Sequence, residues 1–388
     1  MNIFLRLQYL AASSLYDLSN FLLETLQKLL FGRNQCKDPK TILIFSGGGG
    51  YLGDTLCAVP AYKAIQKQYP VARRILMMYG RKFPSSKEIF EAVIPFDEYL
   101  LFEESIGQKF AYYYSLMKKI RGLKVDLLFY LPGPNFSLFR IMRDMAFFKA
   151  AKCKNACGFH LSIHNFFKEA QRAYRQFDPE PVRLMKLLQN AGIQEGIHWD
   201  IPQISFPLQE KNSHPTVAVH PSARIPVKKW PIERFSTVCR YLQEHYKATI
   251  VIIGGKDASE ETKTLIQSLS KPIIDLTGKT TYLEAAEILR QCDFLLTNDT
   301  GPLHLAEAVG TPIIGIYSAR NFPNVWYPVG DNHIIIRKEV DCQICYLEEC
   351  PIMICIKRIS TEEVIDACKR MLEKKGFTST VPSSQPTV

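Results

Sequence analysis

Short apolar runs alternate along the chain with longer segments in which apolar residues recur at helical spacing. In the first half, β-type apolar runs occupy residues 40–46, 74–79, 125–131 and 156–159. Helical patterns lie between them, at residues 54–69, 110–120 and 136–149. Strands that alternate with helices predict a parallel sheet that is covered by helices on both faces.

The same alternation returns in the second half, after residues 190–215, where Gly, Pro and polar residues break the periodicity like a linker. The predicted strands are residues 216–220, 249–253, 273–276, 294–297 and 313–317, and the predicted helices are 232–246, 259–269 and 282–291. We therefore predict an α/β protein with two Rossmann-like domains, residues 37–200 and 214–360. A helix over residues 361–375 and a disordered tail rich in Ser, Thr and Pro, residues 376–388, would follow.

The first 36 residues are predicted to form a segment of their own. Residues 3–31 contain neither Pro nor Gly, which predicts one long helix that ends at Gly32. Apolar residues recur at steps of three and four on one face: Leu7, Ala11, Leu15, Leu18, Leu22, Leu26 and Leu29. Polar residues share the other face: Arg6, Ser13, Asp17, Asn20, Glu24 and Gln27. This pattern is typical of an amphipathic helix.

The charges in this helix limit its role. Its longest uncharged stretch, residues 7–16, is half of the roughly 20 residues that a membrane-spanning helix needs. A signal peptide is disfavoured because Asp17 and Glu24 interrupt the apolar region and no clear cleavage site follows. Two interpretations stay open: the helix lies in a membrane interface, or it packs on the protein or on a second subunit.

Composition narrows the choice of partners. The 388 residues are 47% hydrophobic and 22% charged, and a net charge of +10 favours anionic partners such as nucleotide phosphates, a membrane surface or an anionic glycolipid. Nucleic acid is not an expected partner, because the basic residues are scattered and no recognition motif is present. Several of the 11 cysteines lie in apolar runs, which indicates reduced thiols in a cytosol.

The most informative motif follows the predicted strand at residues 294–297. Asp299, Thr300 and Gly301 form a tight turn into a short helix, with Thr300 as N-cap and Pro302 as an early helical residue. N–H groups at such a helix start, beside the carboxyl end of a strand, favour an anion. His304 would lie one turn into the helix, within reach of a phosphate. A well-capped helix without a ligand is the alternative, and His304 would then be a core or surface histidine.

A basic loop follows the first predicted strand of the second domain. Residues 220–231 carry Arg224, Lys228 and Lys229, at the end of the sheet where α/β proteins bind ligands. These cations would neutralise a diphosphate and stabilise it as a leaving group. Gly254 and Gly255 close the next strand and would line the same pocket. The alternative is a solvated basic loop.

A glycine-rich turn follows the first strand of the chain. Gly48, Gly50 and Gly53 match the spacing of a dinucleotide-binding turn, but no acidic residue ends the second strand to hold a ribose. Asp54 at the helix start would repel a pyrophosphate, and the helix dipole would keep its carboxylate ionised. It is therefore suited to accept a proton from a hydroxyl as a general base. The alternative is an aspartate that only stabilises the helix terminus.

Four cysteines cluster near the carboxyl end of the chain: Cys342, Cys345, Cys350 and Cys355. They could hold a structural zinc, although the spacing is not a common zinc-finger pattern. Buried free thiols and disulfides are the alternatives. No catalytic metal is expected, because no set of Asp and His residues accompanies the cysteines.

Together these segments resemble glycosyltransferase family 9, the ADP-heptose:lipopolysaccharide heptosyltransferase family. The resemblance rests on Leu52-Gly53-Asp54 with residues 59–61, on His220-Pro221 through Pro231, on residues 298–308 with 310–312, and on the cysteine cluster. It runs from about residue 40 to residue 370. Ser222 stands where many members have glycine, and residues 82–194 show little that matches.

The resemblance implies a GT-B fold, in which two Rossmann-like domains face a cleft, with the N-terminal amphipathic helix as an addition. It implies an inverting, metal-independent glycosyltransferase without a cofactor, which moves heptose from ADP-heptose onto a lipopolysaccharide-core or similar acceptor. Asp54 would deprotonate the acceptor hydroxyl. Lys228 would bind the diphosphate together with Arg224, Gly254 and Gly255. Asp299, Thr300, Gly301 and His304 would complete the donor site. The resemblance also implies a cytoplasmic enzyme, and the helix leaves open a peripheral place on the inner face of the plasma membrane.

Other functions stay open from the sequence. Some family members use other donors, so a UDP-sugar such as UDP-GlcNAc is an alternative donor. A lipid-linked glycan is an alternative acceptor to the lipopolysaccharide core. A dinucleotide-dependent oxidoreductase using the glycine turn is a further alternative, as is a nucleotide-sugar-binding protein without activity.

Overall fold

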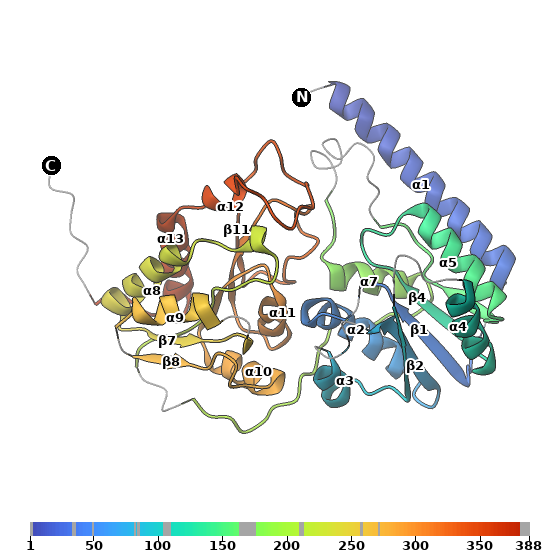
Figure 1. Cartoon of the computed structure of the whole chain (residues 1–388), viewed down its shortest axis with the longest axis horizontal. Coiled ribbons are helices and arrows are strands. Elements are labelled where there is room, and N and C mark those ends of the chain that lie inside the picture. The colour runs from blue at the N-terminus through green and yellow to red at the C-terminus, as the bar shows by residue number, and fades with distance from the viewer. Residues whose placement is uncertain are drawn as a thin grey trace. The chain divides into compact units, whose positions relative to one another are not determined.

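The computed structural model describes residues 3–32, 36–48, 50–80, 83, 86–103, 110–162, 176–208, 213–256, 259–270 and 272–380. The chain divides into two compact units, Met1–Trp199 and Asp200–Val388 (Figure 1). Each unit is built around its own parallel sheet.

The sheet of the first unit has five parallel strands in the order β3-β2-β1-β4-β5. The strands are β1 (Thr41–Ser46), β2 (Arg73–Tyr79), β3 (Glu98–Phe102), β4 (Leu127–Leu131) and β5 (Asn155–Cys157). In the central strand β1, Phe45 is in register with Met77 of β2 and Tyr130 of β4. Central strands that are buried on both faces form almost continuous apolar runs, which is why the sequence marks β1 and β4 so clearly.

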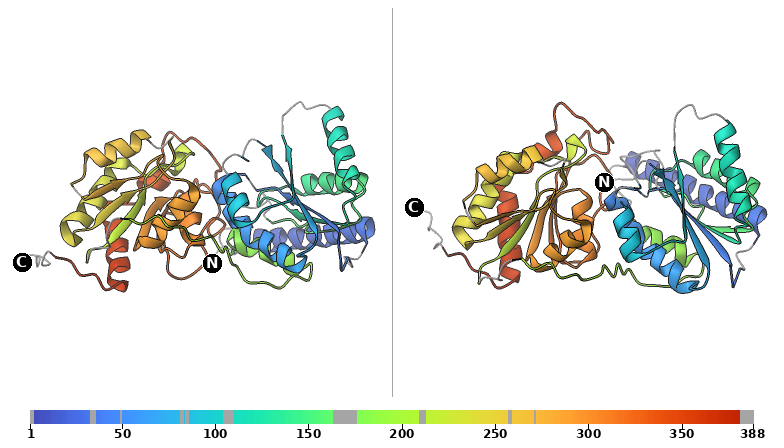
Figure 2. Two further views of the ribbon diagram at one scale, coloured as in Figure 1. Left: turned by 90° about the horizontal axis from the view of Figure 1, so that it is seen from below. Right: turned by 60° about the horizontal axis from the view of Figure 1, so that its bottom comes forward.

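Helices cover both faces of this sheet, as Figures 1 and 2 show. On one face lie α1 (Ile3–Phe31), α4 (Phe110–Gly122) and α5 (Leu138–Ala150), whose buried residues share one core with Phe45 and Tyr130. On the other face lie α2 (Leu52–Gln68) and α3 (Lys87–Val93), with α7 (Glu180–Gln189) packed on α2. There, Tyr62 of α2 contacts the Phe90 ring of α3.

The second unit has a six-stranded parallel sheet in the order β11-β10-β9-β6-β7-β8. Its strands are β6 (Thr216–His220), β7 (Thr249–Ile252), β8 (Ile273–Asp275), β9 (Phe294–Asn298), β10 (Ile313–Tyr317) and β11 (Ile334–Arg337). Its helices are α8 (Ile232–Tyr246), α9 (Ser259–Gln267), α10 (Tyr282–Gln291), α11 (Gly301–Ala308), α12 (Ile354–Lys357) and α13 (Thr361–Lys374). α13 packs on α8, and both share a core cluster with the sheet.

Most predicted elements are present, with shifted ends that have local causes. The helix predicted at 136–149 begins at Leu138, because the Ser137 hydroxyl caps it by accepting the Arg140 N–H. The strand predicted at 156–159 ends at Cys157. Gly158 follows with φ +93°, and a Cβ there would lie 2.2 Å from the carbonyl oxygen of Tyr130. The sequence did not predict β3, β11, α3 or α7.

The tail differs from the expectation of disorder where it is described. Phe377 packs against the core of the second unit, and Thr380 donates its N–H and hydroxyl to the carbonyl of His245 at 2.6 and 2.9 Å. These contacts hold the first residues after α13 on α8. The remainder of the expected tail, residues 381–388, lies outside the described residues.

The amphipathic helix is present as predicted and packs on the first unit. α1 runs from Ile3 to Phe31 and buries Leu23 and Phe31 in the core beside β5 and α5. Phe31 stacks on Phe159 with ring centroids 5.8 Å apart. No helix in the described ranges, α1 included, combines the length and the hydropathy that crossing a membrane requires.

Candidate functional site

The predicted donor residues of the second unit gather where the chain reverses its direction across the sheet. The chain passes from β6 to β7 and β8, then returns to β9 beside β6 and continues to β10 and β11. The ends of β6 and β9 are adjacent, with His220 in register with Thr297. Open α/β sheets bind ligands at such a switch point, outside the carboxyl ends of the strands.

Lys228 and Asp299 meet at this point. Lys228 ends a single 3₁₀ turn, Pro226–Lys228, and its Nζ lies 2.6 Å from Oδ2 of Asp299. The same Nζ donates to the Asp299 carbonyl at 3.3 Å. The side chains are only 14% and 7% exposed, so this is a largely buried ion pair. The structure therefore brings together two predicted donor residues that lie 71 positions apart in the sequence.

Asn298 connects the basic loop to β9, a role that the sequence did not reveal. Its Nδ2 donates to the Pro221 carbonyl at 2.6 Å, and its Oδ1 accepts the Trp230 N–H at 3.1 Å. One fully buried amide thus binds both ends of the loop that carries Lys228. The only sequence signal was its place at the start of the motif.

Helix α11 begins at Gly301, directly after Asp299 of the Lys228–Asp299 ion pair and Thr300. Thr300 is its N-cap and Pro302 lies in its first turn, as predicted. Within the described residues, the Thr300 hydroxyl does not cap the helix but donates back to the Asn298 carbonyl at 3.3 Å. The helix dipole therefore points its positive end at the space beside Gly301 and Lys228.

His304 is buried in α11 and held by a carboxylate. Its Nδ1 lies 2.9 Å from Oε2 of Glu307, and Oε1 of Glu307 accepts the Val329 N–H at 2.7 Å. Glu307 thus fixes the His304 ring through one nitrogen while it also holds the loop after β10. His304 is therefore not a surface histidine, and its contact with a donor phosphate stays a prediction. The sequence did not single out Glu307.

The remaining predicted donor residues surround this edge of the sheet. Arg224 lies exposed in the basic loop, and Gly254 and Gly255 follow β7, where the Gly278 N–H donates to the Gly254 carbonyl at 2.8 Å. Lys229 pairs with Glu261 of α9. Burial alone would raise the pKa of Glu261, but the hydrogen bond from Lys229 lowers it below its ordinary value.

Tyr327 is a further polar residue near Asp299 that the sequence did not indicate. Burial raises its pKa to about 12, with the Asp299 charge adding to the rise and Arg337 opposing it. The phenol therefore keeps its proton at neutral pH and can donate a hydrogen bond.

Asp54 lies in the first unit, in the first turn of α2, as predicted. The loop before it is closely packed, since a Cβ on Gly47 would lie 2.5 Å from the Phe136 ring and 2.8 Å from the Gly133 nitrogen. Ser86, which is fully buried, donates to the Gly50 carbonyl at 2.8 Å and lies 2.7 Å from the Thr55 hydroxyl. These contacts fix the turn that carries Asp54, and the sequence did not predict the part of Ser86.

The cysteine cluster does not form a metal site in the part of the chain that the structure describes, where no group of three or more His, Cys, Asp or Glu is placed to hold an ion. The four thiols are free, and no disulfide joins them. The interpretation as buried thiols is wrong for Cys342 and Cys345, which are exposed, and holds for Cys355. The loop instead supports the basic loop, because the Val227 N–H donates to the Glu348 carbonyl at 3.1 Å.

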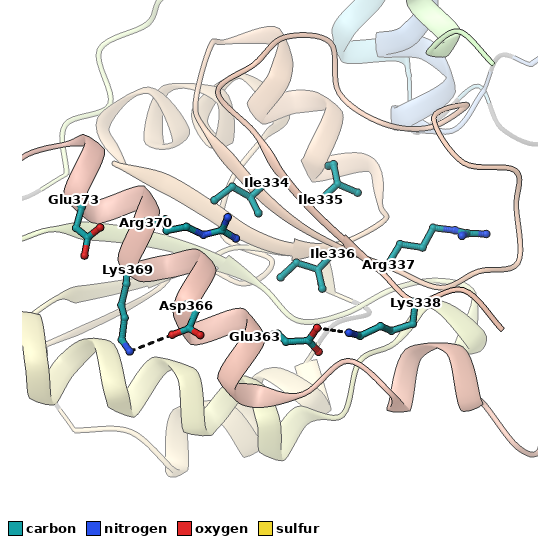
Figure 3. A pocket seen from close by; sticks show the side chains of 10 residues that line it. All are labelled: Ile334, Ile335, Ile336, Arg337, Lys338, Glu363, Asp366, Lys369, Arg370 and Glu373. Carbon is teal, nitrogen blue, oxygen red and sulfur yellow. Dashed lines mark hydrogen bonds and ion pairs between the residues drawn. The ribbon is translucent and has the colours of Figure 1, made fainter. Parts of the chain in front are cut away.

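A hollow of about 650 Å³ lies elsewhere in the second unit, along edge strand β11 and α13 (Figure 3). Its walls carry Ile334, Ile335 and Ile336 on one side and the charged face of α13 on the other, where Asp366 pairs with Lys369 at 3.2 Å. The predicted donor residues are absent from its described lining. We therefore place the candidate site at the ends of β6 and β9 rather than in this hollow.

Part of the chain is similar to a known protein family. Residues 184–354 match the model of glycosyltransferase family 9 (heptosyltransferase). The chain is also 23% identical over 345 residues to lipooligosaccharide heptosyltransferase 2 of Campylobacter jejuni. The aligned residues cover 83% of this chain and 96% of the relative. Residues 184–354 are therefore similar to glycosyltransferase family 9. A further relative, lipooligosaccharide heptosyltransferase 2 of Haemophilus influenzae, is 30% identical over 127 residues, which are 32% of this chain and 36% of the relative.

Solved structures establish the fold of this chain. A family 9 glycosyl transferase from Veillonella parvula aligns with a TM-score of 0.63 at 19% identity, over 86% of this chain and 98% of that one. ADP-heptose lps heptosyltransferase II of E. coli aligns with a TM-score of 0.57 at 17% identity, over 87% and 99%. The fold is GT-B, with two Rossmann-like domains, which confirms the predicted fold class.

Proposed function

We propose that this chain is a family 9 enzyme that transfers heptose from ADP-heptose onto a lipopolysaccharide-core or lipooligosaccharide acceptor, with inversion at the anomeric carbon. The family description and the names of its relatives support the sugar and the acceptor class. The observation that carries the proposal is the buried Lys228–Asp299 pair beside the start of α11. A fixed cation beside a positive helix terminus supports the binding of a diphosphate there.

The proposed donor residues have different roles in binding the nucleotide sugar, which follow from their charges. Lys228, Arg224 and the N–H groups at Gly301 would neutralise the diphosphate, and the backbone of Gly254 and Gly255 would let the nucleotide approach closely. Asp299 holds Lys228 in place, and its carboxylate would accept hydrogen bonds from sugar hydroxyls rather than contact phosphate. A cation held ready for the leaving group needs no rearrangement during the reaction.

Asp54 would act as the general base. It would take the proton from the acceptor hydroxyl as that oxygen attacks the anomeric carbon of the heptose. The bond from this carbon to the diphosphate oxygen breaks at the same time, and ADP leaves with its charge neutralised by Lys228. Attack on the face opposite the leaving group inverts the anomeric configuration.

The acceptor suggests where the enzyme works. Lipopolysaccharide core is attached to a lipid, so we place the enzyme in the cytoplasm, at the inner face of the plasma membrane as a peripheral protein. The +10 net charge supports this location, because that face carries anionic lipids.

Calorimetric titration of the purified chain with ADP-heptose, UDP-GlcNAc and NAD tests the donor. We expect ADP-heptose to bind at least tenfold more tightly than the other two, and mass spectrometry to detect a heptosylated acceptor. Transfer should continue in EDTA, because protein cations supply the charge that stabilises ADP. Preferential binding of UDP-GlcNAc would identify UDP-GlcNAc as the donor in place of ADP-heptose. Binding of NAD alone would overturn the proposal.

A further inference from the structure

The helix α1 packs on the first unit through a mixed face, in which Asn20 and Gln27 lie among buried and half-buried apolar residues. Asn20 accepts the Leu161 N–H at 2.7 Å and donates to the Leu161 carbonyl at 3.3 Å. Gln27 accepts the Phe159 N–H at 3.3 Å. Leu23 and Phe31 are buried on the same side. Satisfied amides and a few buried apolar residues therefore fix the rotation of α1 about its axis.

This rotation turns most of the apolar stripe of α1 away from the protein, whereas Leu26 of the stripe packs against the core. Nine large apolar side chains on the helix are between 47% and 76% exposed: Ile3, Phe4, Leu7, Leu10, Leu15, Leu18, Phe21, Leu22 and Leu29. Their exposed area is on the order of 1,000 Å², larger than the few hundred Å² of the largest apolar patch on a typical soluble monomer. Such a surface indicates an interaction site. α1 lies along the outside of the first unit next to α5 (Figures 1 and 2).

The spacing of the stripe fits a flat surface better than a second helix. Phe4, Leu7, Ala11, Leu15, Leu18, Leu22 and Leu29 follow the 3.6-residue period of a straight helix, so they stay in line along its whole length. A coiled coil needs a 3.5-residue repeat. Continued from Phe4 and Leu7, that repeat would place Ser14, Thr25 and Lys28 in the seam. The stripe is therefore suited to a plane that contacts all its members at once.

The net charge of the first unit indicates what kind of flat surface the stripe contacts. The first unit holds 27 Lys and Arg against 16 Asp and Glu, a net charge of +11, whereas the second holds 21 against 22, a net charge of −1. Lys28 on α1 is exposed and pairs with the exposed Glu24 at 2.6 Å, and Lys149 of α5 donates to the Leu30 carbonyl at the end of α1. On the exposed side of α5, Phe139 and Arg143 add an apolar and a basic side chain. An apolar stripe in a strongly basic unit complements an anionic lipid surface.

We propose that α1 is the membrane-docking element of this enzyme and lies flat on a bilayer that contains anionic lipid. The outward stripe inserts between the lipid headgroups, while Lys28, Lys149 and Arg143 contact their phosphates. Asn20 and Gln27 keep the helix on the protein, so that docking holds the whole first unit at the membrane. The inference deepens the proposed peripheral location, but its test does not depend on the identity of the donor.

Co-sedimentation of the full chain with vesicles tests the proposal. We expect the native chain to bind vesicles of phosphatidylglycerol and phosphatidylethanolamine, and to bind phosphatidylcholine vesicles far more weakly. The double substitution Leu18→Glu with Leu22→Glu should weaken binding to the anionic vesicles at least tenfold, because it removes two inserting side chains and adds two negative charges. Both residues are exposed, so the fold, checked by circular dichroism, should be retained.

A matched control variant distinguishes membrane docking by α1 from a general effect of added negative charge. Light scattering distinguishes docking from self-association. Val71→Glu with Ile352→Glu also changes two exposed apolar residues and adds two negative charges, but outside α1, and should leave binding nearly unchanged. Equal binding by the α1 variant and the native chain would overturn the proposal, and so would no binding by the native chain. A dimer that light scattering finds in the native chain, but not in the α1 variant, would instead identify the stripe as an interface between copies. Calorimetric titration of ADP with the α1 variant should match the native chain, so a failed docking test leaves the transferase proposal standing.

Discussion

At the scale of single residues, the candidate site depends on polar side chains that hold other polar groups in position. Asn298 binds both ends of the basic loop, Glu307 fixes His304, and Ser86 fixes the turn before Asp54. All three are buried, where an unpaired polar group is costly. Their loss should therefore disturb binding without removing a group that reacts.

Asn298→Ala should weaken donor binding through the position of Lys228. The change leaves the Pro221 carbonyl and the Trp230 N–H without this partner, which should cost about 2 kcal/mol of unfolding free energy. ADP affinity should fall about tenfold, because the loop no longer presents its lysine in one position. Chemical denaturation and calorimetry measure the two effects. Asn332→Ala, at an exposed loop position, is the control and should change neither.

Asp54→Asn should abolish turnover while ADP affinity stays within about twofold of the native value. The amide is nearly isosteric but cannot take the acceptor proton, and the loss of a general base costs about 10²–10⁴ in rate. Initial rates at saturating donor and calorimetry measure the two quantities. Transfer at the native rate would remove Asp54 from the mechanism.

At the scale of elements, the ends of strands are held by side chains from neighbouring strands. The Asp126 carboxylate, just before β4, accepts the N–H groups of Lys40 and Thr41 at 3.0 and 3.1 Å and pairs with Lys154 at 2.7 Å. It thus joins the starts of β1, β4 and β5. Burial alone would raise the pKa of Asp126, but the bonds from Lys154, Thr41 and Lys40 lower it below its ordinary value of 3.8.

This shift predicts how the stability of the first unit depends on pH. Because the folded-state pKa of Asp126 lies below the unfolded value, its contribution is complete well above pH 3.8 and is lost as the pH falls through the folded pKa. Asp126→Asn should lower the unfolding free energy by about 1–2 kcal/mol at neutral pH. The difference from the native chain should shrink as the pH falls below 3.8. Urea denaturation at a series of pH values measures it, and a difference independent of pH would contradict the assignment.

At the scale of the whole molecule, the two units have separate sheets and cores, and each carries a different part of the proposed function. The second unit carries the donor residues and is almost neutral, and the first carries Asp54, α1 and the net positive charge. Ligand binding stabilises only the part that binds, by RT ln(1 + [L]/Kd).

ADP should therefore stabilise one unit selectively. We expect scanning calorimetry to resolve two transitions, of which ADP raises only that of the second unit, by about 2.7 kcal/mol at a hundredfold excess over Kd. Lys228→Ala should remove most of this shift. A single transition, or a shift of the transition that Asp126→Asn lowers, would contradict the division of roles.

The sequence predicted most of the fold and the place of the site, for physical reasons. Central parallel strands are buried on both faces, so β1, β4, β6 and β9 form apolar runs that stand out along the chain. The edge strand β3 was missed because partly exposed residues break its apolar run, and β11 was missed because it is only four residues long. Lys228 and Asp299 were placed at one edge of the sheet because parallel strands end on the same side.

By itself, the sequence determined the alternation of strands and helices, the two-domain organisation that we expected and the types of residue at the strand ends, because these follow from local spacing. Only the tertiary structure decided which groups meet: the amide of Asn298 with the loop at Pro221 and Trp230, 77 and 68 residues away. It also decided the orientation of α1. An amphipathic pattern shows that a helix has two faces, but Asn20 and Gln27 accept hydrogen bonds from residues more than 130 positions away, and these contacts turn their side of the helix inward.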